Sequence, residues 1–194
     1  MTVVLKMPLL VRKLAVAVLA LAAVLVLGAC GNKPKISTVG ETEGTYLNVG
    51  PLTYQVQISR QLNPNDTEDS AYFIGVPDAE KLKPDETWFG VFIRVKNPTG
   101  RFEHPAREFE ISDTQGKRYR PVAVGRDNIF AYRPTPISPA GVLPESDSAA
   151  AEAPIGGAML LSRLTLDTLA NRPLELKIFS GSGSPPEGKV ELDV

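Results

Sequence analysis

Residues 88–96 read Trp-Phe-Gly-Val-Phe-Ile-Arg-Val-Lys, and this stretch decides the fold. Every second residue from Phe89 to Val95 is apolar, which is the pattern of a strand with one buried face. Trp88 and Phe92 add aromatic bulk on the opposite face. Because a strand that is apolar on both faces usually lies in the interior of a fold, the stretch predicts the central strand of a β-sheet.

Other stretches with a period of two lie on both sides of this one. The clearest runs from Leu52 to Leu62, where Leu52, Tyr54, Val56 and Ile58 alternate with polar residues and predict one buried face. The remaining expected strands, separated by turn residues, lie at about 109–112, 119–122, 158–166, 174–178 and 190–194.

About seven strands are therefore expected, without βαβ alternation, internal repeats or a helical period after residue 29. This pattern favours an all-β fold, an antiparallel β-sandwich. A small closed barrel is the alternative.

The segment 67–86 has no sustained pattern, although its Tyr72, Phe73, Ile74 and Val76 are expected to pack onto the sheet. Acidic residues at its start could supply oxygens to a calcium ion. The twelve-residue calcium loop with alternating ligands and a central glycine is absent, so a solvated loop is the preferred interpretation and no metal site is expected.

Residues 126–157 form a second long segment without a sustained period, and it contains five prolines. Loops of this length inside a compact domain are usually either functional or disordered. We expect the contact surface of the protein here, with a mobile loop that has no partner as the alternative. The expected contact residues are Tyr132, Arg133, Pro134, Pro136 and Pro139.

The charge balance argues against nucleic acid as a partner. The first 29 residues hold three basic residues and no acidic one, so the rest has 18 basic against 22 acidic residues and a net charge of −4. Lys117, Arg118 and Arg120 form a small basic cluster on the predicted hairpin at 109–122. We interpret this cluster as charges on the wet face or at the edge of a sheet.

Residues 1–29 have the three parts of an export signal: a basic region, an apolar run at 14–27, and the small residues Gly28 and Ala29. A helix over the fourteen apolar residues spans about 21 Å, which is less than the roughly 30 Å hydrocarbon core. A cleaved signal peptide is therefore favoured over a transmembrane helix.

Leu27-Gly28-Ala29-Cys30 resembles the signal-peptidase box of bacterial lipoproteins. This resemblance implies that the Cys30 thiol receives a diacylglyceryl group, that the leader is cut before Cys30, and that the new amino terminus is often acylated as well. Two or more acyl chains hold a protein stably on a membrane. The chain is then expected on the extracytoplasmic face of the bacterial cell membrane, with a lipidated cysteine and flexible tether at 30–49 and a β-sandwich domain at 50–194.

The signal, the tether and several strand motifs together resemble a family. These motifs are Val-Phe-Ile-Arg-Val-Lys-Asn at 91–97, Phe-Glu-Ile-Ser-Asp-Thr-Gln-Gly-Lys-Arg-Tyr at 109–119, Gly-Ala-Met-Leu-Leu at 157–161 and Leu-Glu-Leu at 174–176. The chain is similar in them to the telokin-like immunoprotective extracellular domains of Gram-positive bacteria. The resemblance implies an immunoglobulin-like sandwich and carries over no catalytic residue, while the long segment 126–157 departs from the family pattern.

No motif for catalysis or for a cofactor stands out. His104 is the only histidine and lies in a polar turn, and there is no Gly-rich phosphate loop, zinc motif or nucleophile elbow. We therefore expect a non-catalytic, lipid-anchored module that binds an envelope protein or polysaccharide, without a cofactor. A cell-wall hydrolase that uses scattered carboxylates such as Asp85 and Glu86, and a structural spacer, are the alternatives.

Overall fold

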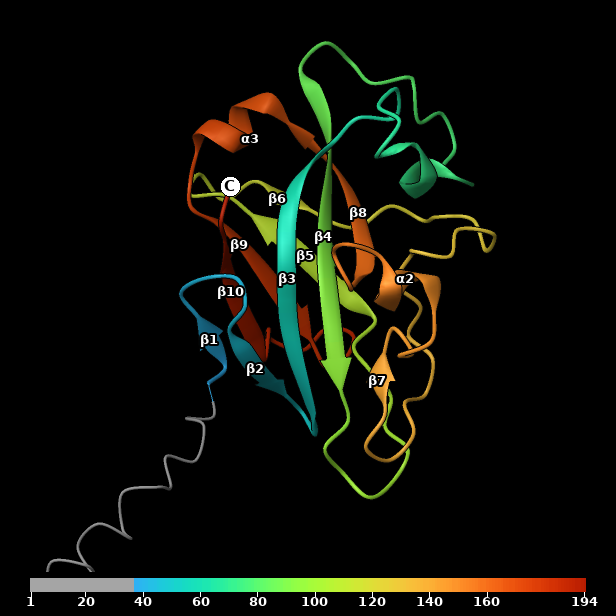
Figure 1. The fold of residues 1–194 in the computed structure, drawn as a ribbon. Coiled ribbons are helices and arrows are strands. Elements are labelled where there is room, and N and C mark those ends of the chain that lie inside the picture. Colours follow the sequence, from blue (N-terminus) through green and yellow to red (C-terminus); the bar gives the residue numbers. More distant parts are fainter. Residues whose placement is uncertain (1–36) are drawn as a thin grey trace, which may run out of the picture. The chain divides into compact units, whose positions relative to one another are not determined.

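The computed structural model describes residues 37–194, which fold into two β-sheets packed face to face (Figure 1). The strands are Val39–Gly40 (β1), Tyr46–Val49 (β2), Leu52–Leu62 (β3), Glu86–Lys96 (β4), Glu108–Ser112 (β5), Arg118–Tyr119 (β6), Val142–Leu143 (β7), Ala158–Thr165 (β8), Leu174–Phe179 (β9) and Gly188–Leu192 (β10). Three short helices join them: Ser70–Phe73 (the 3₁₀ helix η1), Ala149–Glu152 (α2) and Leu166–Ala170 (α3).

Each sheet has five strands. One has the order β1-β10-β9-β5-β6, and we call it the charged sheet because its outer face carries acidic and basic side chains. The other has the order β2-β3-β4-β7 with β8 also paired to β4, and we call it the covered sheet. The predicted β-sandwich is thus confirmed, and the pairing is antiparallel except between β1 and β10.

The prediction of a central strand at 88–96 is confirmed by β4. It pairs with β3 along one side and with β8 and β7 along the other, so no edge of it is open. Every second residue of β4 from Phe89 to Val95 lies in the core between the sheets. Trp88 and Phe92 belong to a second cluster on the outer face. Both faces of the strand are therefore buried from Trp88 to Ile93, whereas Arg94 and Lys96 are exposed.

The core between the sheets is built by the predicted alternation. Strands β3, β4 and β8 face β5, β9 and β10 across it. Its fully buried large side chains include Tyr54, Phe89, Ile93, Ile111 and Leu174. Burial of such side chains contributes about 1.5–3 kcal/mol each, which makes this core the main source of stability.

One expectation for β3 is wrong. Ile58 was predicted on the buried face with Val56, but the register shifts between them, so that Val56 pairs with Ile93 and Ile58 pairs with Phe92. This β-bulge moves the second half of the strand by one residue and exchanges its faces. Ile58 is consequently 38% exposed, and Leu62 packs with Trp88 on the outer side.

The part of the covered sheet's outer face around Trp88 and Phe92 is buried under two irregular segments, 63–85 and 122–157 (Figure 1). Tyr72 packs edge-on against Phe92 and Phe130, with ring centroids 5.1 and 5.0 Å apart. Phe73 packs in the same way on Trp88, whose indole nitrogen donates to the Ala79 carbonyl at 2.7 Å. The segment 67–86 therefore packs onto the sheet as expected, except that Ile74 is 48% exposed and the helical turn η1 was not predicted.

The amino-terminal boundary of the domain also differs from the prediction. Residues 39–49, expected within a flexible tether, form β1 and β2 in the sandwich. Polar side chains fix this segment: Thr42 donates to Asp193 at 2.6 Å, and Glu43 accepts from the backbone of Ser59 and of Asp193 at 3.1 Å. Edge pairing of two or four residues leaves no measurable period, which is why the composition suggested a tether.

The remaining predicted strands need smaller changes. The hairpin at 109–122 is present as β5 and β6, but pairing ends at Tyr119, and Val122 instead donates its backbone N–H to Leu161 at 2.7 Å. Strand β8 ends at Thr165, because Leu166 begins α3. The predicted signal peptide, the box at Leu27, Gly28 and Ala29, and Cys30 lie outside the described residues.

Candidate binding surface

The long segment 126–157 is held to the sandwich at several points. Strand β7 pairs with the end of β4, and Ala131 forms a bridge with Met159 of β8. Ile137 forms a second bridge with Glu103, with reciprocal backbone hydrogen bonds of 2.9 and 3.1 Å. The segment therefore builds a defined surface beside the covered sheet.

A buried asparagine fixes each end of this surface. Asn97, at the end of β4, has no exposed surface, and its amide nitrogen lies 2.7–3.0 Å from the carbonyls of Arg101, Ile137 and Ser138. Its carbonyl accepts from the backbone N–H of Thr99 at 2.9 Å. One side chain thus ties the turn after β4 to the long segment.

Asn128 does the same at the other end. Its amide nitrogen donates to the carbonyls of Tyr72 and Ile74 at 2.8 and 2.9 Å. Its carbonyl accepts from the backbone N–H groups of Phe130 and Ala131, both at 3.0 Å. The bonds to Tyr72 and Ile74 join the two segments that cover the sheet, and the other two fix the turn of the long segment itself, so Asn128 links this segment to the η1 region.

Between these two anchors the surface is hollowed into a groove of about 560 Å³, which we call the loop groove. This volume is within the usual range of small-molecule sites, about 300–1,000 Å³. Its lining combines apolar side chains, mainly of the long segment, with hydroxyl, carboxyl and guanidinium groups. The polar side chains in its lining are Arg133, Thr135, Ser138, Glu145, Ser146, Asp147 and Ser148.

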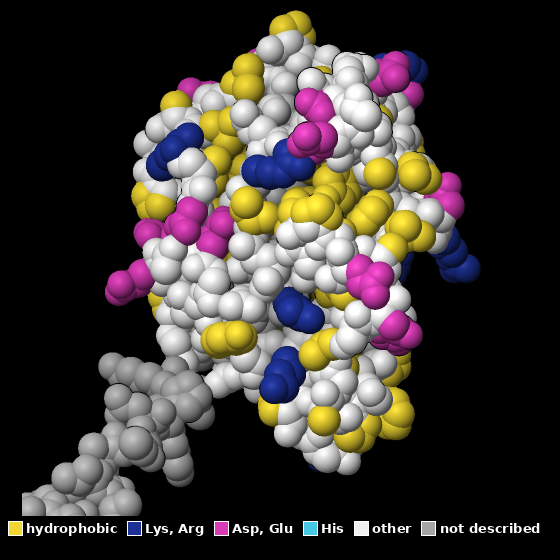
Figure 2. Space-filling view, viewed as in Figure 1, with side chains coloured by type: hydrophobic (Ala, Val, Ile, Leu, Met, Phe, Trp, Pro, Cys, Tyr) yellow, Lys and Arg dark blue, Asp and Glu magenta, His cyan; other side chains and the backbone are white. Residues whose placement is uncertain are grey.

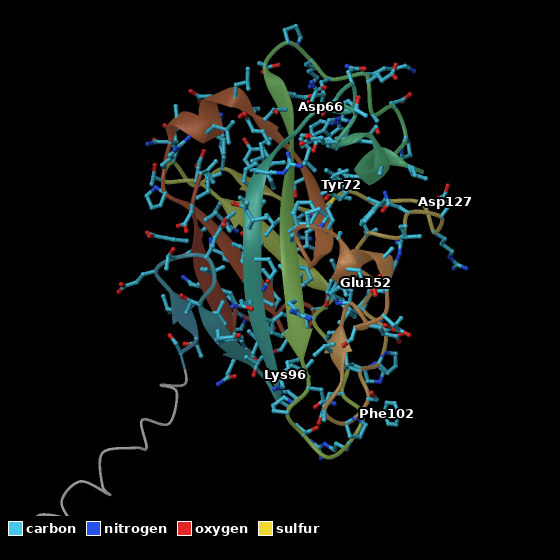
Figure 3. The ribbon with its side chains drawn as sticks, viewed as in Figure 1. Asp66, Tyr72, Lys96, Phe102, Asp127 and Glu152 are labelled. Atoms are coloured by element: carbon cyan, nitrogen blue, oxygen red, sulfur yellow. The ribbon has the colours of Figure 1, made fainter. Side chains whose placement is uncertain are left out.

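Two large apolar side chains of this groove lie open to solvent. Phe102 is 67% exposed and Ile129 is 61% exposed, and both line the groove. Figure 3 places Phe102 beyond the end of β4 and Glu152 on α2, with Asp127 at the tip of the loop that carries Ile129. Exposed apolar groups that gather at a groove are typical of binding surfaces.

The five predicted contact residues take different positions around this groove. Pro136 lines it, and Pro139 is exposed next to its lining residues Ser138 and Ala140. Arg133 also lines it, but its guanidinium is held by the carbonyls of Val124, at 3.1 Å, and Gly125.

Pro134 and Tyr132 lie on the other side of this segment. Pro134 lines a second hollow, which we call the basic pocket. The Tyr132 ring packs edge-on against Phe109 at 5.1 Å, and its hydroxyl donates to the Ala106 carbonyl at 2.7 Å. Burial raises the pKa of the Tyr132 hydroxyl well above its usual value. Tyr132 therefore positions the segment rather than offering its hydroxyl to a ligand.

A second tyrosine completes this arrangement from the core. The Ala106 backbone N–H donates to the Tyr54 hydroxyl at 2.6 Å, so two tyrosines hold both sides of one residue's backbone. Burial raises the pKa of Tyr54 to about 12. The hydrogen bonds of the two tyrosines thereby fix the backbone just before β5.

The basic pocket has a volume of about 380 Å³ and lies between the end of the β5–β6 hairpin and β8. Its floor contains Met159 and Leu161, and its wall contains Arg107, Arg120 and Arg133. Of the predicted basic cluster, Lys117 and Arg118 face acids, at 3.2 Å from Asp167 and 3.7 Å from Glu110. The interpretation of the cluster as charges in contact with solvent is confirmed, because all three residues are exposed, and Arg120 also lines the basic pocket.

Two of the acidic residues considered for calcium or catalysis, Asp69 and Glu86, have other partners. Asp69 pairs with Arg60 and accepts from the Asn63 N–H at 2.9 Å. The Lys83 backbone N–H donates to Glu86 at 3.2 Å, and this bond, with the nearby Lys83 and Arg163 charges, lowers the pKa of Glu86. Within residues 37–194, no three acidic, histidine or cysteine side chains are grouped to hold a metal ion.

Sequence reasoning missed the residues that shape the groove. Phe102 stands alone in a polar turn, and that isolated aromatic residue was the available signal. Asn97 and Asn128 gave no signal, because turns commonly contain asparagine. Among the described residues, no helix has the length and apolar character needed to cross a membrane.

No family model and no curated protein matches the chain. Two solved structures are similar in fold. The yjhA protein from Bacillus subtilis has 11% sequence identity and a TM-score of 0.43, over 79% of this chain and 99% of that chain. An uncharacterized β-sandwich protein from Clostridium difficile 630 has 11% identity and a TM-score of 0.40, over 84% of this chain and 97% of that chain. These similarities concern the fold alone.

Proposed function

We propose that this chain is a lipid-anchored, extracytoplasmic binding module without a catalytic role, which holds an envelope protein or polysaccharide in the loop groove. The observation that carries the proposal is the exposure of Phe102 and Ile129 at a groove of about 560 Å³. An exposed aromatic ring next to hydroxyl and carboxyl groups offers both apolar contact and hydrogen bonds to a partner.

The fixed backbone around the groove supports this function. Asn97 and Asn128 hold its two ends with several hydrogen bonds each. A surface that is already ordered loses less conformational entropy when it binds, which increases affinity. Phe102, in the turn that Asn97 ties to the long segment, and Ile129, in the segment itself, can therefore be presented in one arrangement.

The location and the finer classification belong to the same proposal. The box at Leu27, Gly28 and Ala29 and the lipidated Cys30 would anchor the chain on the extracytoplasmic face of the bacterial membrane. The topology would be immunoglobulin-like, as in the telokin-like immunoprotective domains. Changing Cys30 to Ser should leave uncut precursor in the membrane fraction, and normal maturation of that variant would contradict the anchor.

The decisive test of the binding function is crosslinking in cells followed by mass spectrometry, with binding of purified wall polysaccharide as a parallel assay. The full-length protein is compared with a Phe102→Ser/Ile129→Ser double variant. Leu166→Ser is the matched control, because Leu166 is 46% exposed on α3 and does not line the groove.

We expect a partner that is held by the unchanged chain and by Leu166→Ser, and lost by the double variant. Circular dichroism should show the same fold for all three proteins. The proposal fails if the double variant retains every interaction, or if the unchanged chain binds nothing in both assays.

A further inference from the structure

The basic pocket combines an apolar floor with an excess of positive charge. Arg107, Arg120 and Arg133 line it, and Glu108 is the acidic residue in the lining. We propose that this pocket binds an organic anion with an apolar body, whose carboxylate or phosphate lies between Arg107 and Arg120.

The two outer arginines have no partner in the part of the chain that the structure describes. Neither Arg107 nor Arg120 forms an ion pair or a side-chain hydrogen bond there, whereas the neighbouring Arg118 faces Glu110 at 3.7 Å. Both arginines are exposed at the mouth of the pocket. A free guanidinium offers two parallel donors to one carboxylate or phosphate, which is the geometry that favours arginine for these groups.

The inner arginine, Arg133, adds a positive charge that no neighbouring carboxylate of the described residues neutralises. Arg133 binds only the carbonyl oxygens of Val124 and Gly125, so no carboxylate neutralises it within residues 37–194. Glu108 accepts a hydrogen bond from the Ser182 hydroxyl. The chain as a whole has a formal net charge of −1, so three arginines against one acid are a local reversal of sign that attracts an anion.

The apolar lining of the basic pocket favours a ligand that has an apolar body as well as a negative charge. Val122, Val124, Pro134 and Leu161 contribute side chains to the pocket. Backbone hydrogen bonds hold these walls to β8, from Val122 to Leu161 at 2.7 Å and from Tyr132 to Met159 at 2.8 Å. A mostly apolar cavity with a few convergent polar groups is the usual form of a small-molecule site.

This inference is independent of the loop groove. Ala131 and Arg133 line both the loop groove and the basic pocket. Phe102 and Ile129 line the groove but not the pocket, and Arg107 and Arg120 line the pocket but not the groove. Each site can therefore be removed without touching the exposed residues of the other.

The test uses the full chain in phosphatidylcholine nanodiscs, with methyl NMR signals of Val122, Val124 and Leu161 as the readout. The probes are 4-phenylbutyrate and phenyl phosphate. Two matched controls separate the parts of the ligand: 4-phenylbutylamine has the apolar body with the opposite charge, and acetate has the charge without the body.

We expect saturable shifts of these methyl signals with both anionic probes and none with the amine or acetate. An Arg107→Gln/Arg120→Gln double variant should bind at least about tenfold more weakly, because charge-assisted hydrogen bonds are lost. Arg94→Gln, an exposed arginine on the covered sheet, should bind as the unchanged chain does.

Equal binding of the amine, unchanged affinity in the double variant, or no saturable shift with either anion would overturn the proposal. Val124→Ser provides a second variant with the arginines intact, and it should weaken phenylbutyrate binding by removing apolar contact.

Nanodiscs that contain phosphatidylglycerol distinguish a membrane lipid from a soluble molecule as the source of the anionic group. Shifts without any added probe would assign the anionic group to a membrane lipid, and unchanged signals would assign it to a soluble ligand.

Discussion

The outer faces of the two sheets differ, although both are built by strands with the same alternation. On the charged sheet, Lys177 of β9 lies between Glu110 and Glu175 at 3.8 and 3.7 Å, and Lys189 lies 3.7 Å from Glu175. On the covered sheet, the equivalent positions of β4 and β8 hold Trp88, Phe92 and other apolar residues. In Figure 2, which views the covered sheet, apolar side chains gather on the half where the two irregular segments lie.

This difference shows what the irregular segments do. A sheet with a charged outer face has its apolar side chains buried once its inner face is packed, and it needs only short connections. A sheet that is apolar on both faces requires a second layer, and segments 63–85 and 122–157 provide it without regular strands. The loop groove and the basic pocket are then formed at the borders of this second layer, so the apolar outer face is the structural reason for both candidate sites.

The comparison is tested most strongly by Phe92→Asp. Phe92 is 1% exposed beneath Tyr72, so the new carboxylate would be buried without a partner. Such a charge costs several kcal/mol against a typical total stability of about 5–15 kcal/mol, and we expect the domain to unfold at ambient temperature. Thermal denaturation followed by circular dichroism measures the effect.

Ile58→Asp is the matched control for this substitution. Ile58 pairs with Phe92 in the register and lies on the same face, but it is outside the cover. We expect it to cost less than about 1 kcal/mol, because a partly exposed carboxylate keeps its hydration. If both variants were equally stable, the outer face would not be a core.

The next prediction concerns the link between the two covering segments. Asn128→Ala leaves the carbonyls of Tyr72 and Ile74 and the N–H groups of Phe130 and Ala131 without their partner. The bonds to Tyr72 and from Ala131 are fully buried, and each group left unpaired there costs about 1–3 kcal/mol, so we expect a loss of about 2–6 kcal/mol. Amide hydrogen exchange should rise at 70–76 and 122–132 while β9 and β10 stay protected. Asn63→Ala, in an exposed turn, is the control, and equal protection in both variants would contradict the link.

The same contrast explains which parts of this architecture the sequence predicts. The strands β3, β4 and β9 were found because their alternation is carried by many residues. The bulge in β3 could not be seen, since Gln57 and Ile58 fit an unbroken alternation as well as an interrupted one. The docking of β1 and β2 depends on pairs with β10 and β3 that are distant in sequence or too short for a period.

The candidate site was predictable only as a region. The prolines and the missing period marked 126–157 as a contact segment, and its residues do line the loop groove. Phe102 reaches the same groove from another part of the chain because Asn97 ties its turn to Ile137 and Ser138. Side-chain bonds to distant backbone leave no pattern in a single sequence.

A smaller effect is expected for the inner side of the long segment. Tyr54→Phe removes the acceptor for the Ala106 N–H and should cost about 1 kcal/mol at pH 7. Burial raises the pKa of Tyr54 in the folded chain from 10.0 to about 12, so above pH 10 the unfolded chain releases a proton that the folded chain keeps. The free energy of unfolding therefore falls as the pH rises from 10 towards 12, by up to about 1.4 kcal/mol per pH unit.

The phenylalanine variant lacks this contribution, and other alkaline titrations are common to both proteins. Urea denaturation at pH 7, 10 and 11.5 should thus show the difference between the two proteins shrinking as the pH rises. A constant difference would mean that Tyr54 is not shielded from solvent, and that the long segment is fixed by the outer layer alone.

The smallest effect belongs to the charged sheet. Lys189→Ala removes a cation that lies 3.7 Å from Glu175, and both side chains of this pair are partly exposed, at 40% and 33%. Pairs of this kind contribute about 0–1 kcal/mol and are screened by salt. Urea denaturation at low ionic strength should show a loss within that range, and the loss should vanish in about 1 M salt, where the screening length is about 3 Å. A salt-independent loss of several kcal/mol would instead mean that this face is as buried as the outer face of the covered sheet, and the contrast between the two sheets would no longer explain where the long segments pack.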